Sequence, residues 1–242
     1  MLKGLRRWVQ PIRDGRLDPD FPRVVASGVA LQQHLPWMEL IAVGGTAAAL
    51  HAGHRVSYDV DFVSRNLRGN FAATLAAVTE WSEWTTNRST PDKIILGEYN
   101  AVKLGIRQAF RQTPIQTIEK QGLRIPTLPE CFKIKAYLVC QRGATRDFVD
   151  ACALFDQLPP TLVGTLFAEM DKDYPSDDQL SRATHFAAAV RLGPKDEADV
   201  ELSSYKQLHS PYNNLRGYIL PRLEEVSRVA LGERLGKGPD VS

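Results

Sequence analysis

Two aspartates, Asp59 and Asp61, stand in the segment SYDVDFVS, where polar and apolar residues alternate. The alternation predicts a β-strand, and side chains two residues apart on a strand point to the same face. This face therefore carries two adjacent carboxylates, which repel each other unless a cation lies between them. Mg²⁺ prefers hard oxygen ligands, so the pair is a candidate metal site. A half-exposed strand whose polar face meets water explains the same pattern.

A second candidate feature is the tripeptide Gly44-Gly45-Thr46, which precedes the acidic pair in the chain. Two glycines let the backbone come close to a ligand, and the amides that follow would open a helix, where a phosphate is favoured. Thr46 could cap that helix or donate its hydroxyl to a phosphate. A plain glycine turn with a threonine cap remains the alternative.

Together these two features form one compact unit of strand, glycine turn, short helix and acidic strand. The unit would place a phosphate cradle beside a metal site. Phosphoryl and nucleotidyl transfer need this combination, because they depend on a positioned polyphosphate and on metal ions at the attacking and leaving oxygens.

The segment GGTAAALHAGHRVSYDVDFVS resembles the signature of the AbiEii/AbiGii abortive-infection toxin family, which are nucleotidyltransferases of the DNA polymerase β superfamily. A second block, LPECFKIKAYLVCQRGATRDFVDACALF, resembles the same family: a helix with a lysine, then Arg-Gly, then a basic residue and two acids in the next helix. The resemblance covers roughly residues 21–158. The remainder, residues 159–242, resembles no family.

The resemblance implies that NTP phosphates lie on the glycine turn and that Mg²⁺ or Mn²⁺ is held by the acidic pair. It also implies that Lys135 is a phosphate-binding cation, and it matches Arg142 to the family's arginine, Arg146-Asp147 to its basic-acidic pair and Asp150 to its second acid. Arg55 could also reach a triphosphate, because guanidinium suits phosphate oxygens. The predicted catalytic residues are Asp59, Asp61, Lys135 and Asp150, the predicted nucleotide-binding residues are Gly44, Gly45, Thr46, Arg55, Arg142 and Arg146, and the predicted metal ligands are Asp59 and Asp61.

The spacing in the second block agrees with these roles. Lys135 and Arg142 are seven residues apart, so they share a helix face. Asp147 and Asp150 are neighbours on the next helix, roughly opposite its apolar stripe. A surface lysine and a solvated acidic helix face are the alternatives. Asp147 has a simple explanation as a helix-start acid, so Asp150 is the preferred candidate.

One position departs from the superfamily. A third carboxylate often stands on a later strand, and here Gly105 occupies the matching place. Glu98, Asp147 or Asp150 could substitute, the reaction could proceed without a third acid, or the activity could be impaired. His54 could accept a proton, although a structural or solvent-facing histidine explains it too.

The elements that must position these residues follow from apolar periodicity and from turn residues. The first half predicts an α/β arrangement and the second half a series of helices. The expected helices span 21–35, 46–52, 71–84, 129–142, 145–158, 161–173 and 177–192 with a last one from 221, the expected strands span 38–43, 57–64, 93–99, 101–108 and 122–125, and loops fill 193–214. The tail GKGPDVS is expected to be disordered.

Composition points to an ordinary globular chain: 242 residues, 43% hydrophobic, 24% charged, with a net charge of only +2. Residues 103–146 hold nine Lys and Arg against two acids, and residues 147–201 hold twelve acids against four bases. This asymmetry suggests a face that meets phosphates, unless the charges mix on the folded surface. Three scattered cysteines indicate neither a disulfide framework nor a zinc site.

We therefore predict an α+β fold: a polymerase-β-type nucleotidyltransferase core with a mixed sheet over residues 1–126, followed by a helical region over 127–242. The predicted activity is transfer of a nucleoside monophosphate from an NTP to RNA such as tRNA, or to protein, by the toxin of a toxin–antitoxin or abortive-infection system. A small-molecule nucleotidyltransferase and a nucleotide-binding module without turnover are the alternatives. The expected partners are the NTP, RNA and a cognate antitoxin, with no membrane contact and a cytoplasmic location.

Overall fold

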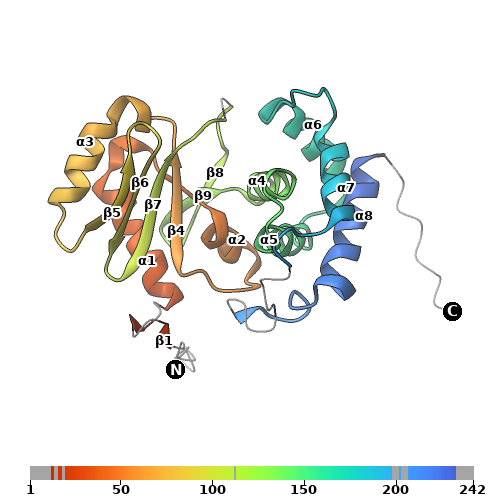
Figure 1. The fold of residues 1–242 in the computed structure, drawn as a ribbon, viewed down its shortest axis with the longest axis horizontal. Coiled ribbons are helices and arrows are strands. Elements are labelled where there is room, and N and C mark those ends of the chain that lie inside the picture. Colours follow the sequence, from red (N-terminus) through yellow and green to blue (C-terminus); the bar gives the residue numbers. More distant parts are fainter. Residues whose placement is uncertain are drawn as a thin grey trace. The chain divides into compact units, whose positions relative to one another are not determined.

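The computed structural model describes residues 12–13, 16–17, 20–111, 113–197, 202 and 207–232. The chain divides into two compact units, and Figure 1 gives the elements of each. The first unit holds residues 1–46, 57–110 and 119–125, and the second holds 47–56, 111–118 and 126–242. Neither unit is continuous in sequence. The domain boundary after residue 126 stays a prediction.

The first unit is built on a five-stranded sheet in the order β3-β4-β7-β6-β5. Strands β4 and β7 are parallel, and the other neighbours are antiparallel, so the sheet is mixed, as predicted. The strands are β3 (Ile41–Val43), β4 (Asp59–Ser64), β5 (Thr85–Thr90), β6 (Ile94–Tyr99) and β7 (Val102–Gln108).

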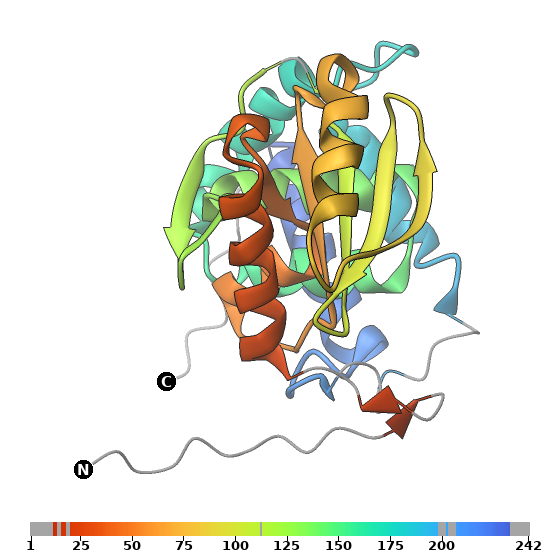
Figure 2. The same cartoon turned by 90° about the vertical axis from the view of Figure 1, so that its left-hand side faces the viewer.

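Helices α1 (Phe21–His34) and α3 (Leu67–Glu80) cover one face of this sheet (Figure 2). The residues that β4 and β7 turn toward the helices, Val60, Phe62, Leu104 and Ile106, are buried. Burial alternates strictly along β4, so the two aspartates lie on the opposite face of the sheet. The predicted orientation of the acidic pair is thereby confirmed.

The remaining short elements of the chain's first half are two strand pairs, a 3-10 turn and a helix. Strand β1 (Ile12–Arg13) pairs with β2 (Arg16–Leu17), and β8 (Thr117–Lys120) pairs with β9 (Leu123–Pro126). The 3-10 turn η1 covers Pro36–Met38, and helix α2 covers Gly44–Ala52.

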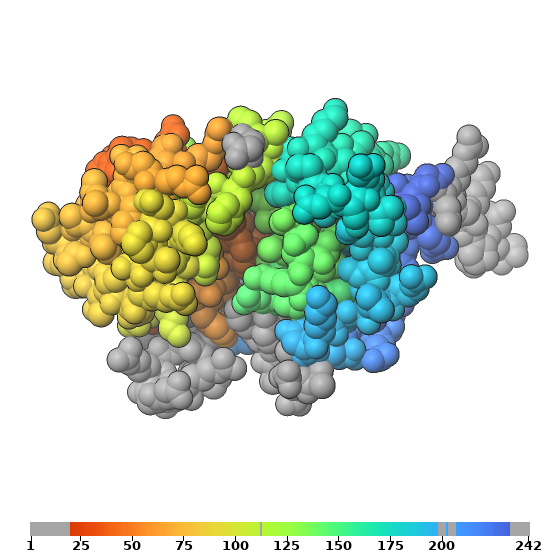
Figure 3. All heavy atoms as spheres, turned by 45° about the horizontal axis from the view of Figure 1, so that its top comes forward, coloured from red at the N-terminus to blue at the C-terminus, as the bar shows by residue number. Residues whose placement is uncertain are grey.

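Strand β5 forms an edge of the sheet, and nearly all of its residues are exposed, as the yellow surface in Figure 3 shows. Beside it, an aromatic stack closes the end of the unit. The ring of Trp81 lies between His34 and Tyr99, with centroid distances of 4.6 Å and 3.8 Å. Trp84 lies flat on Gly97, where an added Cβ would come within 2.1 Å of the indole. This glycine therefore makes room for the tryptophan.

The second unit is helical after residue 126. Phe132, Phe155, Phe167 and Phe186 pack ring against ring in its core. The elements are α4 (Leu128–Gln141), α5 (Thr145–Phe155), the 3-10 turn η2 (Pro160–Leu162), α6 (Val163–Asp173), α7 (Arg182–Leu192), the π-helical segment η5 (Leu215–Ile219) and α8 (Leu220–Ala230).

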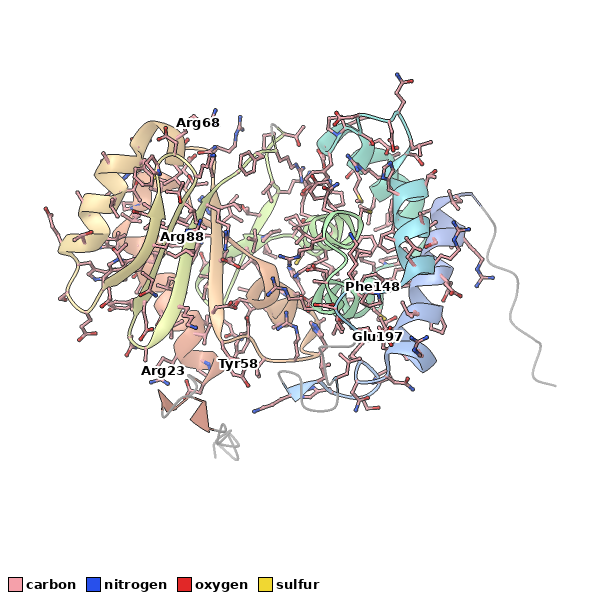
Figure 4. The ribbon with its side chains drawn as sticks, viewed as in Figure 1. Arg23, Tyr58, Arg68, Arg88, Phe148 and Glu197 are labelled. Atoms are coloured by element: carbon pink, nitrogen blue, oxygen red, sulfur yellow. The ribbon has the colours of Figure 1, made fainter. Side chains whose placement is uncertain are left out.

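Helix α5 is the central helix of this unit, because every residue from Asp147 to Phe155 is buried. Phe148 lies on its inner side, as Figure 4 shows. Just beyond the helix, Asp156 accepts hydrogen bonds from the Tyr212 and Tyr218 hydroxyls and from Arg222, at 3.0, 2.8 and 2.7 Å. This carboxylate therefore ties the last helical segment to α5.

Several elements differ from the sequence-based expectation. Helix α3 begins four residues earlier than predicted and ends at Glu80, because the tryptophans that follow leave the helix to stack on β6. Helix α7 begins at Arg182 rather than at 177, since Ser181 caps it by accepting from the Thr184 amide. The predicted disordered tail lies outside the described residues. Among the helices that the structure describes, none is long and apolar enough to cross a membrane.

Candidate active site

The glycine turn lies where β3 ends and α2 begins. Gly44 has a φ of +72°, a left-handed conformation that strongly favours glycine. A Cβ placed on it would lie 3.8 Å from both Cβ and Oδ2 of Asp61. Val43 pairs with Asp61 in the β3–β4 register, which explains this proximity. The turn and the acidic pair are therefore neighbours in the first unit, as the sequence predicted.

Thr46 follows the turn and is buried. Its hydroxyl donates a 2.5 Å hydrogen bond to the carbonyl oxygen of Asp59. The hydroxyl proton therefore fastens the start of α2 to β4, and donating it to a phosphate, as predicted, would break that bond. Ser57, which the sequence analysis did not select, donates from its hydroxyl to Oδ1 of Asp59 at 3.1 Å.

Asp59 and Asp61 lie side by side on the face of β4 that α1 and α3 leave uncovered. The Asp61 side chain is 39% exposed, and its Oδ1 accepts from Nε of Arg107 at 3.3 Å. Arg107 comes from β7, the parallel neighbour of β4, so the sheet itself brings the two residues together. The acidic pair is thus accessible to a ligand and has a cation beside it.

Gly105 pairs directly with Asp61 across β4 and β7. A Cβ on Gly105 would lie 2.8 Å from Oδ1 of Asp61 and 2.9 Å from Cδ2 of Leu96. Asp61 therefore leans over the glycine, and an acid at position 105 would have to displace both side chains. The packing of this face therefore leaves no room for a third carboxylate at position 105.

A divalent ion fits this donor set under one condition. Among the residues that the structure describes, no three His, Cys, Asp or Glu side chains gather closely enough to hold a metal by themselves. Mg²⁺, however, is commonly bound by one or two carboxylates together with substrate phosphates and water. Asp59 and Asp61 suit that mode of binding, in which water or the phosphates of a bound nucleotide would complete the coordination.

Lys135, Asp147 and Asp150 of the second block form a buried ion cluster with His54 and Arg55 in the second unit. Asp150 is fully buried and accepts from Nε and Nη2 of Arg55 at 2.7 and 2.8 Å. It also accepts from His54 Nε2 at 2.8 Å and pairs with Lys135 Nζ at 2.7 Å. Lys135 reaches Asp147 as well, at 3.2 Å.

This environment shifts the pKa of two groups. Burial alone would raise the pKa of the Asp150 carboxyl, but Arg55 and Lys135 hold it well below its usual value. Burial lowers the pKa of His54, and it outweighs the opposing effect of the Asp150 carboxylate. The cluster therefore contains a carboxylate and a neutral imidazole, whose Nδ1 has no hydrogen-bond partner among the described residues.

The cluster changes what its members can do for a nucleotide. Arg55 and Lys135 are 3% and 1% exposed and already paired, so a direct phosphate contact would require them to leave Asp150. Arg142 pairs with Asp147 at 2.5 Å but keeps 40% of its side chain exposed. Arg146 is exposed. The acidic face of α5 is also buried, not solvated, because α4 and the segment after α2 supply cations to it.

The structure thus gathers the predicted residues in two places. Gly44, Gly45, Thr46, Asp59 and Asp61 lie together in the first unit, and Arg55, Lys135, Arg142 and Asp150 lie together in the second. Sequence reasoning missed Arg107 as a neighbour of Asp61. Its spacing of two residues from Gly105 was the available signal, because it places Arg107 on the same sheet face.

No protein-family model matches the chain. A stretch of 101 residues is 32% identical to part of the mycolic acid-containing lipids exporter MmpL11 of Mycolicibacterium smegmatis, a match that covers 38% of this chain. The chain spans only 11% of the length of that protein.

Several solved structures are distantly similar. A provisionally assigned nucleotidyltransferase from H. pylori has 14% identity and a TM-score of 0.47, with 86% of this chain and 92% of that chain covered. A nucleotidyltransferase-like antigen of Paracoccidioides brasiliensis has 15% identity and a TM-score of 0.44, covering 72% and 95%. The antibiotic-resistance factor ANT(2'')-Ia has 15% identity and a TM-score of 0.42, covering 62% and 94%. At these values none of them assigns the chain to a family.

Proposed function

We propose that the chain is an NTP-dependent nucleotidyltransferase that moves a nucleoside monophosphate onto an acceptor, with Mg²⁺ or Mn²⁺ held by Asp59 and Asp61. The observation that carries the proposal is the contact between the glycine turn and the acidic pair. Gly44, in a left-handed conformation, opens α2, and a Cβ placed on it would lie 3.8 Å from Oδ2 of Asp61, so a phosphate on the turn would lie beside the proposed metal ligands.

In the proposed reaction, the backbone amides at the start of α2 bind the NTP phosphates. The acceptor oxygen attacks the α-phosphorus, its new bond to phosphorus forms, and the bond to the pyrophosphate oxygen breaks. A bound divalent ion would stabilise the charge that develops on the phosphate oxygens. With glycine at 105, we expect the acceptor proton to pass to water or to the phosphates rather than to a third carboxylate.

The buried ion cluster lies in the second unit. We propose Arg142 and Arg146, whose side chains are exposed in the second unit, as nucleotide-binding residues, although Nε and Nη2 of Arg142 also donate to Asp147. Arg55, Lys135 and Asp150 would act mainly by holding α4 and α5 together. The catalytic roles first proposed for Lys135 and Asp150 would then be indirect.

The acceptor we propose is RNA such as tRNA, or a protein hydroxyl, as the family resemblance implies for a toxin that is paired with an antitoxin. The basic stretch 103–146 adds little support, because its Arg111, Lys133 and Lys135 are buried in ion pairs with acids. The second candidate function is a nucleotide-binding module without turnover, which the glycine at 105 favours because it leaves the carboxylate pair without a third acid.

The test is transfer of label from α-labelled NTPs in the presence of Mg²⁺, with total RNA, the protein itself and small hydroxylated molecules as acceptors. We expect Asp59→Asn and Asp61→Asn to lower turnover by at least ~10²-fold, the scale of losing one strong transition-state stabiliser. Both residues are part-exposed, so circular dichroism should show intact folds.

Asp92→Asn, an equal charge change in the exposed β5–β6 turn, serves as the control and should keep the parental rate. Transfer by both site variants at the parental rate would remove the metal assignment. A parent that binds NTP and Mg²⁺ but labels no acceptor would favour the binding module.

A further inference from the structure

Asp61 presents its two carboxylate oxygens to different neighbours. Oδ2 faces the glycine turn, 3.8 Å from the place of a Cβ on Gly44. Oδ1 faces β7, 2.8 Å from the place of a Cβ on Gly105, and accepts from Arg107 Nε at 3.3 Å. The Asp61 carboxylate therefore points one oxygen toward the proposed phosphates and the other toward the guanidinium of Arg107.

Gly105 makes this orientation possible. Arg107 stands two residues further along β7, opposite Val63, so its side chain must reach back along the strand to meet Asp61. A larger residue at 105 would collide with Oδ1 of Asp61, the atom that accepts from Arg107. The glycine and the arginine thus act on the same oxygen: the glycine leaves room for Oδ1 of Asp61, and the guanidinium donates to it.

We propose that Arg107 is a positioning residue that holds Oδ1 of Asp61 and takes the place of a second divalent cation, so that the site binds a single divalent ion. The inference rests on the proposed function. A pair of carboxylates carries a charge of −2, which one divalent ion neutralises. A second ion would need a further anionic ligand near Asp61, and the structure places the cation of Arg107 there instead.

Removing the Arg107 charge should raise the affinity for Mn²⁺ and lower the rate of transfer. A merely structural role would not produce these opposite effects. Removing the Arg107 charge removes a cation that repels the metal ion, so binding of Mn²⁺ should become tighter. Removing it also frees Asp61 to turn away from the glycine turn, so nucleotidyl transfer should become slower. Arg107 is 47% exposed, and its replacement should therefore leave the fold intact.

The experiment is an Mn²⁺ titration followed by electron paramagnetic resonance, on the full chain without nucleotide, combined with the transfer assay. We expect the parent to bind one Mn²⁺. Arg107→Gln should bind Mn²⁺ on the order of 10-fold more tightly, as expected for loss of a unit charge roughly 5 Å away in a water-like dielectric. Its turnover should fall, and Arg107→Lys, which keeps the charge, should bind Mn²⁺ like the parent.

Arg88→Gln is the matched control, because it removes the same charge from an exposed position on β5, which two strands separate from β4 (Figure 4). It should match the parent in both measurements. Two Mn²⁺ ions per parent chain, or Arg107→Gln with parental affinity and rate, would overturn the role of Arg107. Failure of the proposed function would give a different result: an Asp61→Asn variant would still bind Mn²⁺ like the parent.

Discussion

Lys135 is held in the second unit by two buried ion pairs. Its ammonium lies 2.7 Å from an Asp150 oxygen and 3.2 Å from an Asp147 oxygen, with 1% of the residue exposed. Removing one partner of a buried ion pair is costly, because the remaining charge loses its compensation without regaining water. An activity loss on changing Lys135 would therefore have to be separated from a loss of folded protein.

We predict that Lys135→Met lowers the free energy of unfolding by about 3–5 kcal/mol, the range for breaking a buried pair from one side. Urea denaturation followed by circular dichroism measures this change. Lys172→Met, at an exposed position of α6, is the control and should stay within about 1 kcal/mol of the parent. An unchanged urea midpoint for Lys135→Met would mean that the cluster adds nothing to stability.

At this scale the sequence predicted the acidic pair but not the partners of the cations. The alternation around Asp59 and Asp61 is a local pattern, and a strand converts it directly into a shared face. The partners of Lys135 and Arg55 depend on how α4 and α5 pack, which no spacing within one helix reveals. Helical periodicity places Lys135 and Arg142 on one face, and the structure shows both of them meeting Asp147.

Among the strands of the five-stranded sheet, β5 is the one that the sequence did not predict. Its residues TTNRST are polar on both faces, because an exposed edge strand needs no apolar alternation. Trp84 anchors the strand to the sheet: its Nε1 donates to Thr86 at 2.9 Å, and its ring covers Gly97 of β6. The helix predicted over 71–84 forms as α3 but ends at Glu80, since Trp81 and Trp84 pack on β6.

We predict that Gly97→Ala lowers the free energy of unfolding by about 1–3 kcal/mol, the usual cost of overpacking a filled site. The new methyl group would meet the Trp84 ring at 2.1 Å, so the indole must move. Urea midpoints give the measurement. Gly164→Ala, in α6 with open space around the glycine, should be neutral or stabilising. Equal midpoints for the parent and Gly97→Ala would show that the stack yields freely.

For the whole molecule, the buried imidazole of His54 links stability to pH. Its pKa is lowered by burial, although Asp150 opposes the shift and Arg55 and Lys135 reinforce it. Below about pH 6.5 the unfolded chain binds a proton at this position that the folded chain does not bind. Stability is therefore greatest above that pH and falls as the solution becomes acidic. The lowered pKa of Asp150 acts in the same direction, but only near pH 4 and below.

We predict that His54→Gln makes the free energy of unfolding less dependent on pH between 7 and 5. The slope should decrease by up to about 1.4 kcal/mol per pH unit, the limit for one proton. Urea melts at several pH values give the slopes, and comparing slopes removes any constant cost of the substitution. His185→Gln, a less buried histidine beside Asp178, is the control. A parental slope in His54→Gln would place the acid sensitivity elsewhere.

The division into two units has an optical consequence. Trp37, Trp81 and Trp84 all belong to the first unit, and the fourth tryptophan of the sequence, Trp8, lies outside the described residues. In a Trp8→Phe background, indole emission comes from the sheet-bearing unit alone, whereas far-ultraviolet dichroism is dominated by the helices of the other. The two signals on one denatured sample would separate if the units unfold in turn and coincide if they unfold as one.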